Sequence, residues 1–181
     1  EDDVTLNSGR RIIDADTDSG TDVTVDVSGV NITLNSGVVT GGEVGEPAGT
    51  SSPFSGGIGQ TDDFLEINVD RNDTGGILDA FDIDASTFHD GIFIDELSGD
   101  LRVGEVHTIE NVALRTTVGS IVDAEDDLAA DVKGQAIDLD ANDGNGVVAS
   151  AGEASIGEID NDLEIDSRRG SAPVGLNDSG D

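Results

Sequence analysis

Short runs of alternating apolar and polar residues recur along the chain, at positions 4–6, 23–27, 32–34, 65–69, 92–94, 137–139 and 163–165. Alternation with a period of two places every apolar side chain of a run on one face of a β-strand. The runs are separated by clusters of Asn, Asp, Ser and Gly, which are residues that favour tight turns. The pattern therefore predicts an all-β protein of many short strands, with at most one turn of helix.

Four segments in the first half of the chain recur, in the same order, in the second half. The longest shared pattern is Asp-Val-x-Gly-x-x-Ile-x-Leu, and a shorter echo, Thr-Leu-Asn-Ser-Gly, occurs at both 5–9 and 33–37. The spacing between the copies shrinks toward the C-terminus because the first copy has the longer loops, above all across 40–57. The matched segments are 4–6 with 112–114, 12–16 with 121–125, 26–34 with 131–139, and 58–67 with 156–165.

This duplication sets the expected domain organisation. Residues 1–181 form a single unit, with internal copies at about 4–69 and 112–166 and intervening coils at 70–111. The acidic turn at 177–181 would lead directly into the first strand of a following copy. We therefore expect the chain to be a segment of a longer or tandemly repeated protein.

Repeated short strands with drifting loop lengths are typical of a β-solenoid, in which each coil buries its apolar face by stacking on the next coil. We therefore predict a parallel β-helix with an internal duplication. A β-sandwich repeat is the alternative. It would give similar strands, although it does not explain the nested echoes.

In a parallel β-helix the apolar residues of each run point inward and form stacked ladders, while their polar neighbours face solvent. The solvent-facing neighbours are expected to include Thr33, Glu66, Asp138 and Glu164. The inward-facing residues are expected to be Leu6, Val25, Val27, Ile32, Leu34, Leu65, Ile67, Ile121, Ile137, Leu139, Ile156, Leu163 and Ile165.

A rhythm of Gly, Ile and Leu residues recurs in the second half of the chain. Its segments have the patterns Gly-Ser-Ile-x-Asp-Ala, Ile-x-Leu-x-Ala, Ser-Ile-Gly and Leu-x-Ile, and they lie within 119–124, 131–141, 154–157 and 163–165. With longer insertions, the rhythm also runs through 9–37 and 56–69. This rhythm resembles that of filamentous-haemagglutinin-like repeats in very large bacterial surface and adhesin proteins.

The resemblance implies a right-handed parallel β-helix that is secreted, non-catalytic and located at the cell surface. Such a protein serves as a stalk or an adhesive fibre. The partners that it implies are neighbouring modules, stacked head to tail, and a glycan or cell-surface receptor.

Composition narrows the chemistry further. The 181 residues include 40 Asp and Glu against 8 Lys and Arg, a formal net charge of −32, so the chain lacks the basic surface that binds nucleic acid. It has no Cys, Met, Trp or Tyr, which excludes disulfides, thiol nucleophiles and zinc–thiolate sites. Its apolar runs are too short to cross a bilayer, so we expect no membrane insertion. The charge suits a soluble extracellular fibre, whose self-repulsion is relieved by salt or divalent ions.

Calcium is the cofactor that the acidic turns favour, because this hard cation binds about six to eight oxygen ligands. Asp14, Asp16 and Asp18 have the first, third and fifth spacing of an EF-hand loop, although the glycine comes one place late and Val25 stands at the twelfth position. A comparable acidic turn lies at 138–144. The candidate calcium ligands are Asp14, Asp16, Asp18, Asp138, Asp140 and Asp143.

We assign no catalytic residues from the sequence. The two histidines, His89 and His107, lie beside turn signals, and Lys133 is the single lysine, so neither a nucleophile–base pair nor a basic groove stands out. We expect a non-enzymatic structural module that stacks end to end in a large secreted surface, adhesin or matrix-fibre protein. The alternative is a calcium-dependent glycan-binding or glycan-cleaving β-helix domain.

Overall fold

The computed structural model describes residues 2–14, 24–37, 56–69, 75–82, 91–142 and 154–167. Regular structure in these ranges is entirely β, which confirms the predicted class. None of the described residues forms a helix with the length and hydrophobicity needed to cross a membrane. The strands are β1 Val4–Asn7, β2 Val27–Gly29, β3 Ile32–Ser36, β4 Leu65–Val69, β5 Leu78–Asp82, β6 Ile92–Glu96, β7 Leu101–His107, β8 Val112–Thr116, β9 Ile121–Asp123, β10 Val132–Lys133, β11 Ile137–Ala141 and β12 Ile165–Asp166.

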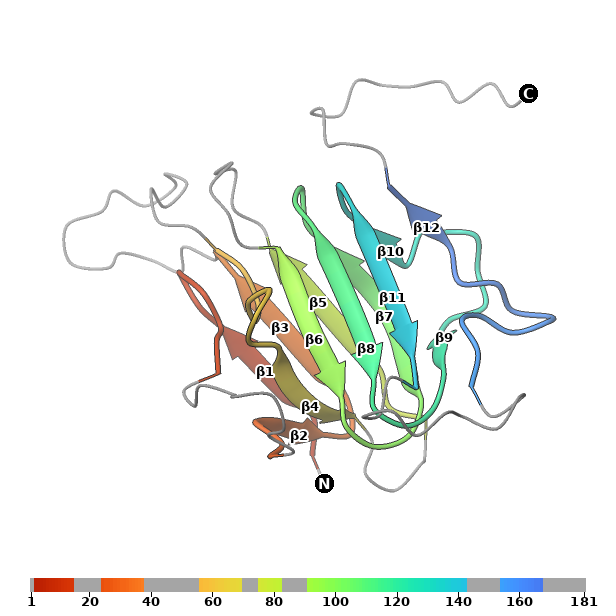
Figure 1. Ribbon diagram of the computed structural model, residues 1–181, viewed down its shortest axis with the longest axis horizontal. Helices are drawn as coiled ribbons and strands as arrows, with labels where there is room; N and C mark the ends of the chain where they lie inside the picture. Colours follow the sequence, from red (N-terminus) through yellow and green to blue (C-terminus); the bar gives the residue numbers. More distant parts are fainter. Residues whose placement is uncertain are drawn as a thin grey trace.

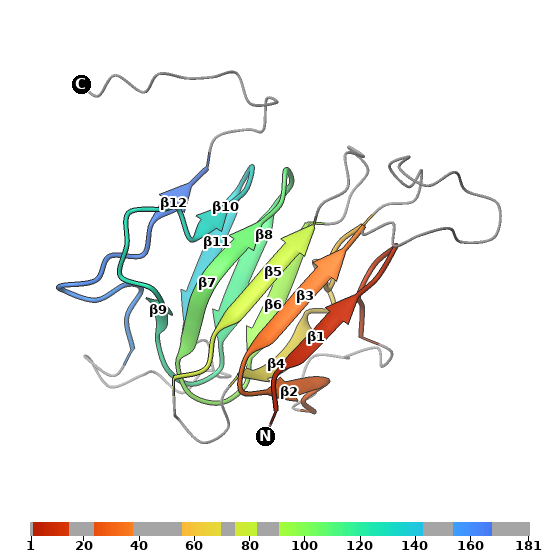
Figure 2. The ribbon, with the colours of Figure 1, turned by 180° about the vertical axis from the view of Figure 1, so that it is seen from behind.

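The strands form two sheets, which lie one behind the other in Figures 1 and 2. Sheet A has the order β1-β3-β5-β7-β10-β12, with β9 also paired to β7, and sheet B has the order β11-β8-β6-β4-β2. Successive strands alternate between the sheets, except that β9 and β10 both belong to sheet A. We call one strand of sheet A and the following strand of sheet B a circuit. Each sheet therefore gains a strand with each circuit, always at the same edge.

All pairings between the named strands are parallel. Parallel neighbours cannot be joined by a tight hairpin, so the chain must cross to the other sheet before it returns beside its earlier strand. The antiparallel pairing that a sandwich of hairpins requires is not found between these strands. Within the described ranges, antiparallel bridges occur only at two tight turns, 60–63 and 158–161.

The registers align core residues into columns that run from circuit to circuit. One column in sheet B joins Leu65, Ile94, Leu114 and Leu139, and the first three are buried. Most residues of the columns belong to one core cluster shared by both sheets. A longer column in sheet A consists of Leu6, Leu34, Ala80, Val106, Val132 and Ile165.

The structure confirms most of the predicted inward-facing residues. Ile137, Leu139 and Leu163 are partly buried and pack against the core cluster, and Val25 is also partly buried. Those that are buried outright are Val27, Ile32, Leu34, Leu65, Ile67 and Ile121.

The prediction is wrong for Leu6, Ile156 and Ile165, which are 36 %, 48 % and 48 % exposed. Each is the terminal member of its column, so only one neighbouring circuit covers it. A periodic pattern cannot distinguish such a terminal position from an interior one.

The polar neighbours also differ from the expectation. Asp138 is exposed, Thr33 and Glu164 are half-buried, and Glu66 is buried. The prediction for Glu66 is wrong because the face of β4 opposite the core is itself covered, as the burial of Asn68 on the same face shows.

The two internal copies make the same pairings in opposite sheets. Val4 pairs with Ile32 in sheet A, and the matched residues Val112 and Ile137 pair in sheet B. The two copies lie in opposite sheets because β8 comes seven strands after β1 and the chain changes sheet at each step between them. The second copy is therefore turned to the other side of the core.

One core column of sheet B contains a carboxyl group. Glu96 pairs with Ile67 on one side and Thr116 on the other, and its side chain is fully buried. The backbone N–H groups of Val69 and Ser98 donate to its two carboxylate oxygens at 2.8 and 3.0 Å. Burial, with a smaller contribution from the charge of Asp95, raises the pKa of Glu96 to about 8. Its neutral form therefore prevails in the folded protein at neutral pH.

We expect the loss of unfolding free energy on truncating a column residue to depend on how deeply that residue is buried. Leu34→Ala should lower the free energy of unfolding by about 3 kcal/mol, because it leaves a cavity between circuits. Leu6→Ala, in the same column, should cost less than about 1 kcal/mol because Leu6 is already partly exposed. Urea unfolding followed by far-ultraviolet circular dichroism measures both, and equal losses would contradict the column description.

The raised pKa of Glu96 predicts a pH-dependent stability. Between the ordinary pKa of 4.5 and the folded-state value of about 8, the folded protein binds more protons than the unfolded one, so stability falls as pH rises. The slope due to this one group is at most about 1.4 kcal/mol per pH unit. The free energy of unfolding of the wild type minus that of Glu96→Gln should therefore fall as the pH rises from 4.5 to about 8. The same difference taken with the surface control Asp138→Asn should stay nearly constant.

Candidate functional site

Six acidic residues gather into two clusters of three. In each cluster, one carboxylate oxygen from every residue lies within 4.8 Å of the corresponding oxygens of the other two. Cluster 1 consists of Asp14, Asp26 and Glu66, and cluster 2 consists of Asp123, Asp131 and Glu164.

The two clusters occupy matched positions of the internal duplication. Forty acidic residues in one chain make chance proximity common, but composition alone does not explain why the same three positions meet twice. The matched pairs are Asp14 with Asp123, Asp26 with Asp131, and Glu66 with Glu164.

The same hydrogen bonds build both clusters. The N–H of Asp26 donates to the carbonyl of Glu66 at 2.9 Å, and the N–H of Glu66 donates back to the Asp26 carboxylate at 3.2 Å. In the second copy, the Asp131 N–H donates to the Glu164 carbonyl at 2.9 Å, and the Glu164 N–H donates to the Asp131 carboxylate at 2.8 Å. Each cluster thus joins two neighbouring strand positions of one sheet, sheet B for cluster 1 and sheet A for cluster 2.

A glycine turn holds the glutamate of each cluster in place. Gly59 and Gly157 have φ angles of +65° and +72°, in the region that favours glycine, and each leads into a tight turn at 60–63 or 158–161. The N–H of each glycine donates at 2.8 Å to a carbonyl of the preceding circuit, from matched isoleucines. The turn is therefore anchored to the circuit that carries the two aspartates.

Desolvation opposes ionisation of one aspartate in each cluster, Asp26 in cluster 1 and Asp131 in cluster 2. Asp14, Glu66, Asp123 and Asp131 are buried. Desolvation raises the pKa of Asp131 to about 6, with further contributions from the charges of Asp123 and Glu164. The pKa of Asp26, the matched residue, is raised by the same main cause and by the charge of Asp14.

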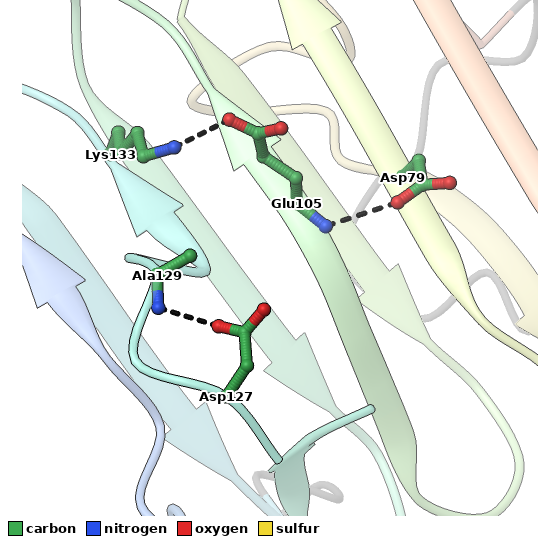
Figure 3. A network of polar contacts seen from close by, with 5 residues as sticks. All are labelled: Asp79, Glu105, Asp127, Ala129 and Lys133. Atoms are coloured by element: carbon green, nitrogen blue, oxygen red, sulfur yellow. Dashed lines mark hydrogen bonds and ion pairs between the residues drawn. The ribbon is translucent and has the colours of Figure 1, made fainter. Parts of the chain in front are cut away.

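No basic side chain in the described ranges contacts cluster 2. Within the described structure, backbone N–H groups supply its carboxylates with hydrogen bonds: those of Glu125 and Asp126 donate to Asp123, and that of Glu164 donates to Asp131. Lys133, two residues after Asp131, has its ammonium 2.5 Å from the carboxylate of Glu105 instead (Figure 3). The single lysine of the chain therefore does not neutralise cluster 2.

Two buried oxygens at the clusters lack a hydrogen-bond partner. One is Oε2 of Glu164, a member of cluster 2. The other is Oδ1 of Asn68, which lies two residues after Glu66 on the same face of β4 and is only 5 % exposed. Apart from Arg102 Nε, these are the only buried side-chain atoms without a partner among the described residues. A buried acceptor without a donor costs about 1–3 kcal/mol, which a bound cation would offset.

The candidate ligands from the sequence are only partly placed. Asp14 belongs to cluster 1, where its partners come from 26 and 66 rather than from an EF-hand-like loop. Asp16, Asp18 and Asp143 lie outside the described residues. Asp138 and Asp140 lie exposed on β11, outside both clusters.

Sequence reasoning missed five of the six cluster residues. The signal that could have identified them is the recurrence of an acidic residue at matched positions of both copies, in the segments that define the duplication. The missed residues are Asp26, Glu66, Asp123, Asp131 and Glu164.

The two ends of the sheets form a second candidate site. In sheet A, β1 and β12 are the terminal strands, and in sheet B the terminal strands are β2 and β11. Leu6 and Ile165, at the two ends of the longest core column, are 36 % and 48 % exposed, whereas the four residues between them are fully buried. Both ends thus present apolar core positions beside strand edges to which the described residues add no further strand.

Neutralising a cluster carboxylate should stabilise the protein when no divalent cation is present. Because the pKa of Asp131 is raised from 3.8 to about 6, its stabilising contribution is present below pH 3.8 and is lost as pH rises through 6. Asp131→Asn keeps an oxygen that accepts the Glu164 N–H, and it should be more stable than the wild type at pH 8 by the order of 1 kcal/mol. Thermal melts in a chelator buffer measure this. An unchanged or lower melting temperature, with Asp138→Asn as the surface control, would contradict it.

Comparisons with known proteins do not identify a function, so the functional conclusion rests on the two acidic clusters and the exposed ends of the sheets. A scan against protein-family models gives no match, and searches of curated proteins and of solved structures give none either.

Proposed function

We propose that the chain is a segment of a right-handed parallel β-solenoid that stacks end to end on further segments of the same kind. The product is an extended stalk or filament of a large secreted bacterial surface, adhesin or matrix-fibre protein. The observation that carries the proposal is the contrast between the buried interior and the exposed terminal residues of the longest core column.

Two features of the sheets support the solenoid. The strands alternate between two parallel sheets, and each circuit adds one residue to each main core column. Most apolar side chains are thus buried by the circuits before and after their own, as in repeat proteins whose units bury a core only by stacking. The resemblance to haemagglutinin-like repeats supplies the handedness and the cell-surface setting.

The chemistry of the ends defines the partner. It must offer parallel strand edges to both sheets at once and place apolar residues over Leu6 at one end or Ile165 at the other. Another segment of this fold satisfies both requirements. The contact joins the C-terminal end of one segment to the N-terminal end of the next, and such a contact does not close into a ring, so it builds a fibre.

The charge of the chain sets the conditions for assembly. A net charge of −32 makes neighbouring segments repel each other, and salt screens the repulsion between charges that lie more than about a Debye length apart. Stacking of separate chains should therefore be favoured at high ionic strength.

Electron microscopy and sedimentation at high salt test the proposal. Wild-type chains should form filaments whose axial repeat is about 24–29 Å, since the described residues form five strands in sheet B and six along the sheet A path, spaced about 4.8 Å apart. Leu6→Asp and Ile165→Asp should each suppress filaments while the monomer stays folded by circular dichroism, because each places a charge at an interface.

Two variants serve as matched controls. Leu128 and Ile159 are 94 % and 97 % exposed but belong to no column, so Leu128→Asp and Ile159→Asp should leave assembly unchanged. A wild type that remains monomeric at high salt, or filaments that the Leu6 and Ile165 variants form equally well, would overturn the proposal.

A further inference from the structure

We propose that clusters 1 and 2 are two copies of one calcium site, each joining neighbouring strand positions of a sheet, and that Asn68 supplies an amide ligand to the first. This inference is independent of end-to-end stacking, because all the ligands of each site come from one chain.

The spread of the carboxylate oxygens suits a single ion. Calcium binds oxygens at about 2.3–2.6 Å, so two ligands on opposite sides of one ion are at most about 5 Å apart. The three oxygens of each cluster lie within 4.8 Å of one another. Carboxylates, amide oxygens and water are the ligands that calcium prefers, and neither cluster contains a histidine that would favour a softer metal.

The buried oxygens without partners are the independent observation. In the first copy, the Ser28–Asn68 pair lies two residues further along the strands than the hydrogen-bonded Asp26 and Glu66, so Asn68 and Glu66 are neighbours on the face of β4 opposite the core. The amide oxygen of Asn68 is buried there and receives no hydrogen bond. An oxygen in such a position costs stability unless a cation or a bound water satisfies it, and the acidic neighbours favour the cation.

In the second copy, the buried oxygen without a hydrogen-bond partner belongs to a member of the cluster itself. Glu164 Oε2 is buried without a partner, and among the described residues no basic side chain contacts the three carboxylates of cluster 2. The position matched to Asn68 is Asp166, which keeps an oxygen ligand two residues after the glutamate. A cation would supply the positive charge that cluster 2 lacks.

Calcium titration by calorimetry, at a fixed high sodium chloride concentration, tests the inference with the full 181-residue chain. The wild type should bind two ions per chain. Asp26→Asn should remove one, Asp131→Asn the other, and the double variant both. Asp138→Asn removes an exposed carboxylate outside the clusters and should still bind two.

The position of Asn68 offers a sharper pair of variants. Asn68→Ala should weaken calcium binding at one of the two sites roughly tenfold, since it removes a ligand. Asn68→Asp introduces the residue that the second copy carries, and it should bind at least as tightly as the wild type. This pair decides the question if Asp26→Asn does not fold, because neither change touches the carboxylates.

Stability gives a second readout. Calcium should raise the melting temperature of the wild type more than sodium chloride of equal ionic strength does, because site binding adds to screening. The double variant should have the same melting temperature in calcium as in sodium chloride of equal ionic strength. Titrations that show no bound ion, or cluster variants that bind as the wild type does, would overturn the inference.

Discussion

Parallel, in-register stacking of circuits is the interaction on which the structure depends. Each core residue of a column is covered by its counterparts in the neighbouring circuits, so no single circuit has a core of its own. Ile94, for example, is fully buried between Leu65 and Leu114, which come from two other strands of sheet B. The composition is suited to this arrangement, because a chain with few aromatic residues can still bury branched aliphatic side chains when they repeat at one position.

The same constraint decides what the sequence could predict. Period-two runs predict strands such as β3, β4 and β6, and phase-matched copies predict buried residues such as Ile32 and Leu65, because both signals are local or repeated. The exposure of Leu6 and Ile165 was not predictable, since a terminal circuit has the same pattern as an interior one. The burial of Glu66 depends on what covers the outer face of β4, and alternation contains no information about that.

The acidic clusters show the limits of spacing arguments for metal sites. The 14, 16, 18 spacing predicts a local acidic loop, but the carboxylates that lie near Asp14 in the structure are 12 and 52 residues further along the chain. Asp26 lies in the same circuit as Asp14, and Glu66 joins the two aspartates from the next circuit. In a protein with so many carboxylates, recurrence at matched positions is a better guide than local density.

The exchange of sheets between the copies has a mechanical consequence. Because the second copy is turned to the other side of the core, cluster 1 belongs to sheet B and cluster 2 to sheet A. An ion bound at only one cluster would join strands on one side of the core and favour bending of the stack toward that side. The two sites that we propose lie in opposite sheets, so the proposed array would be held on both sides and remain straight.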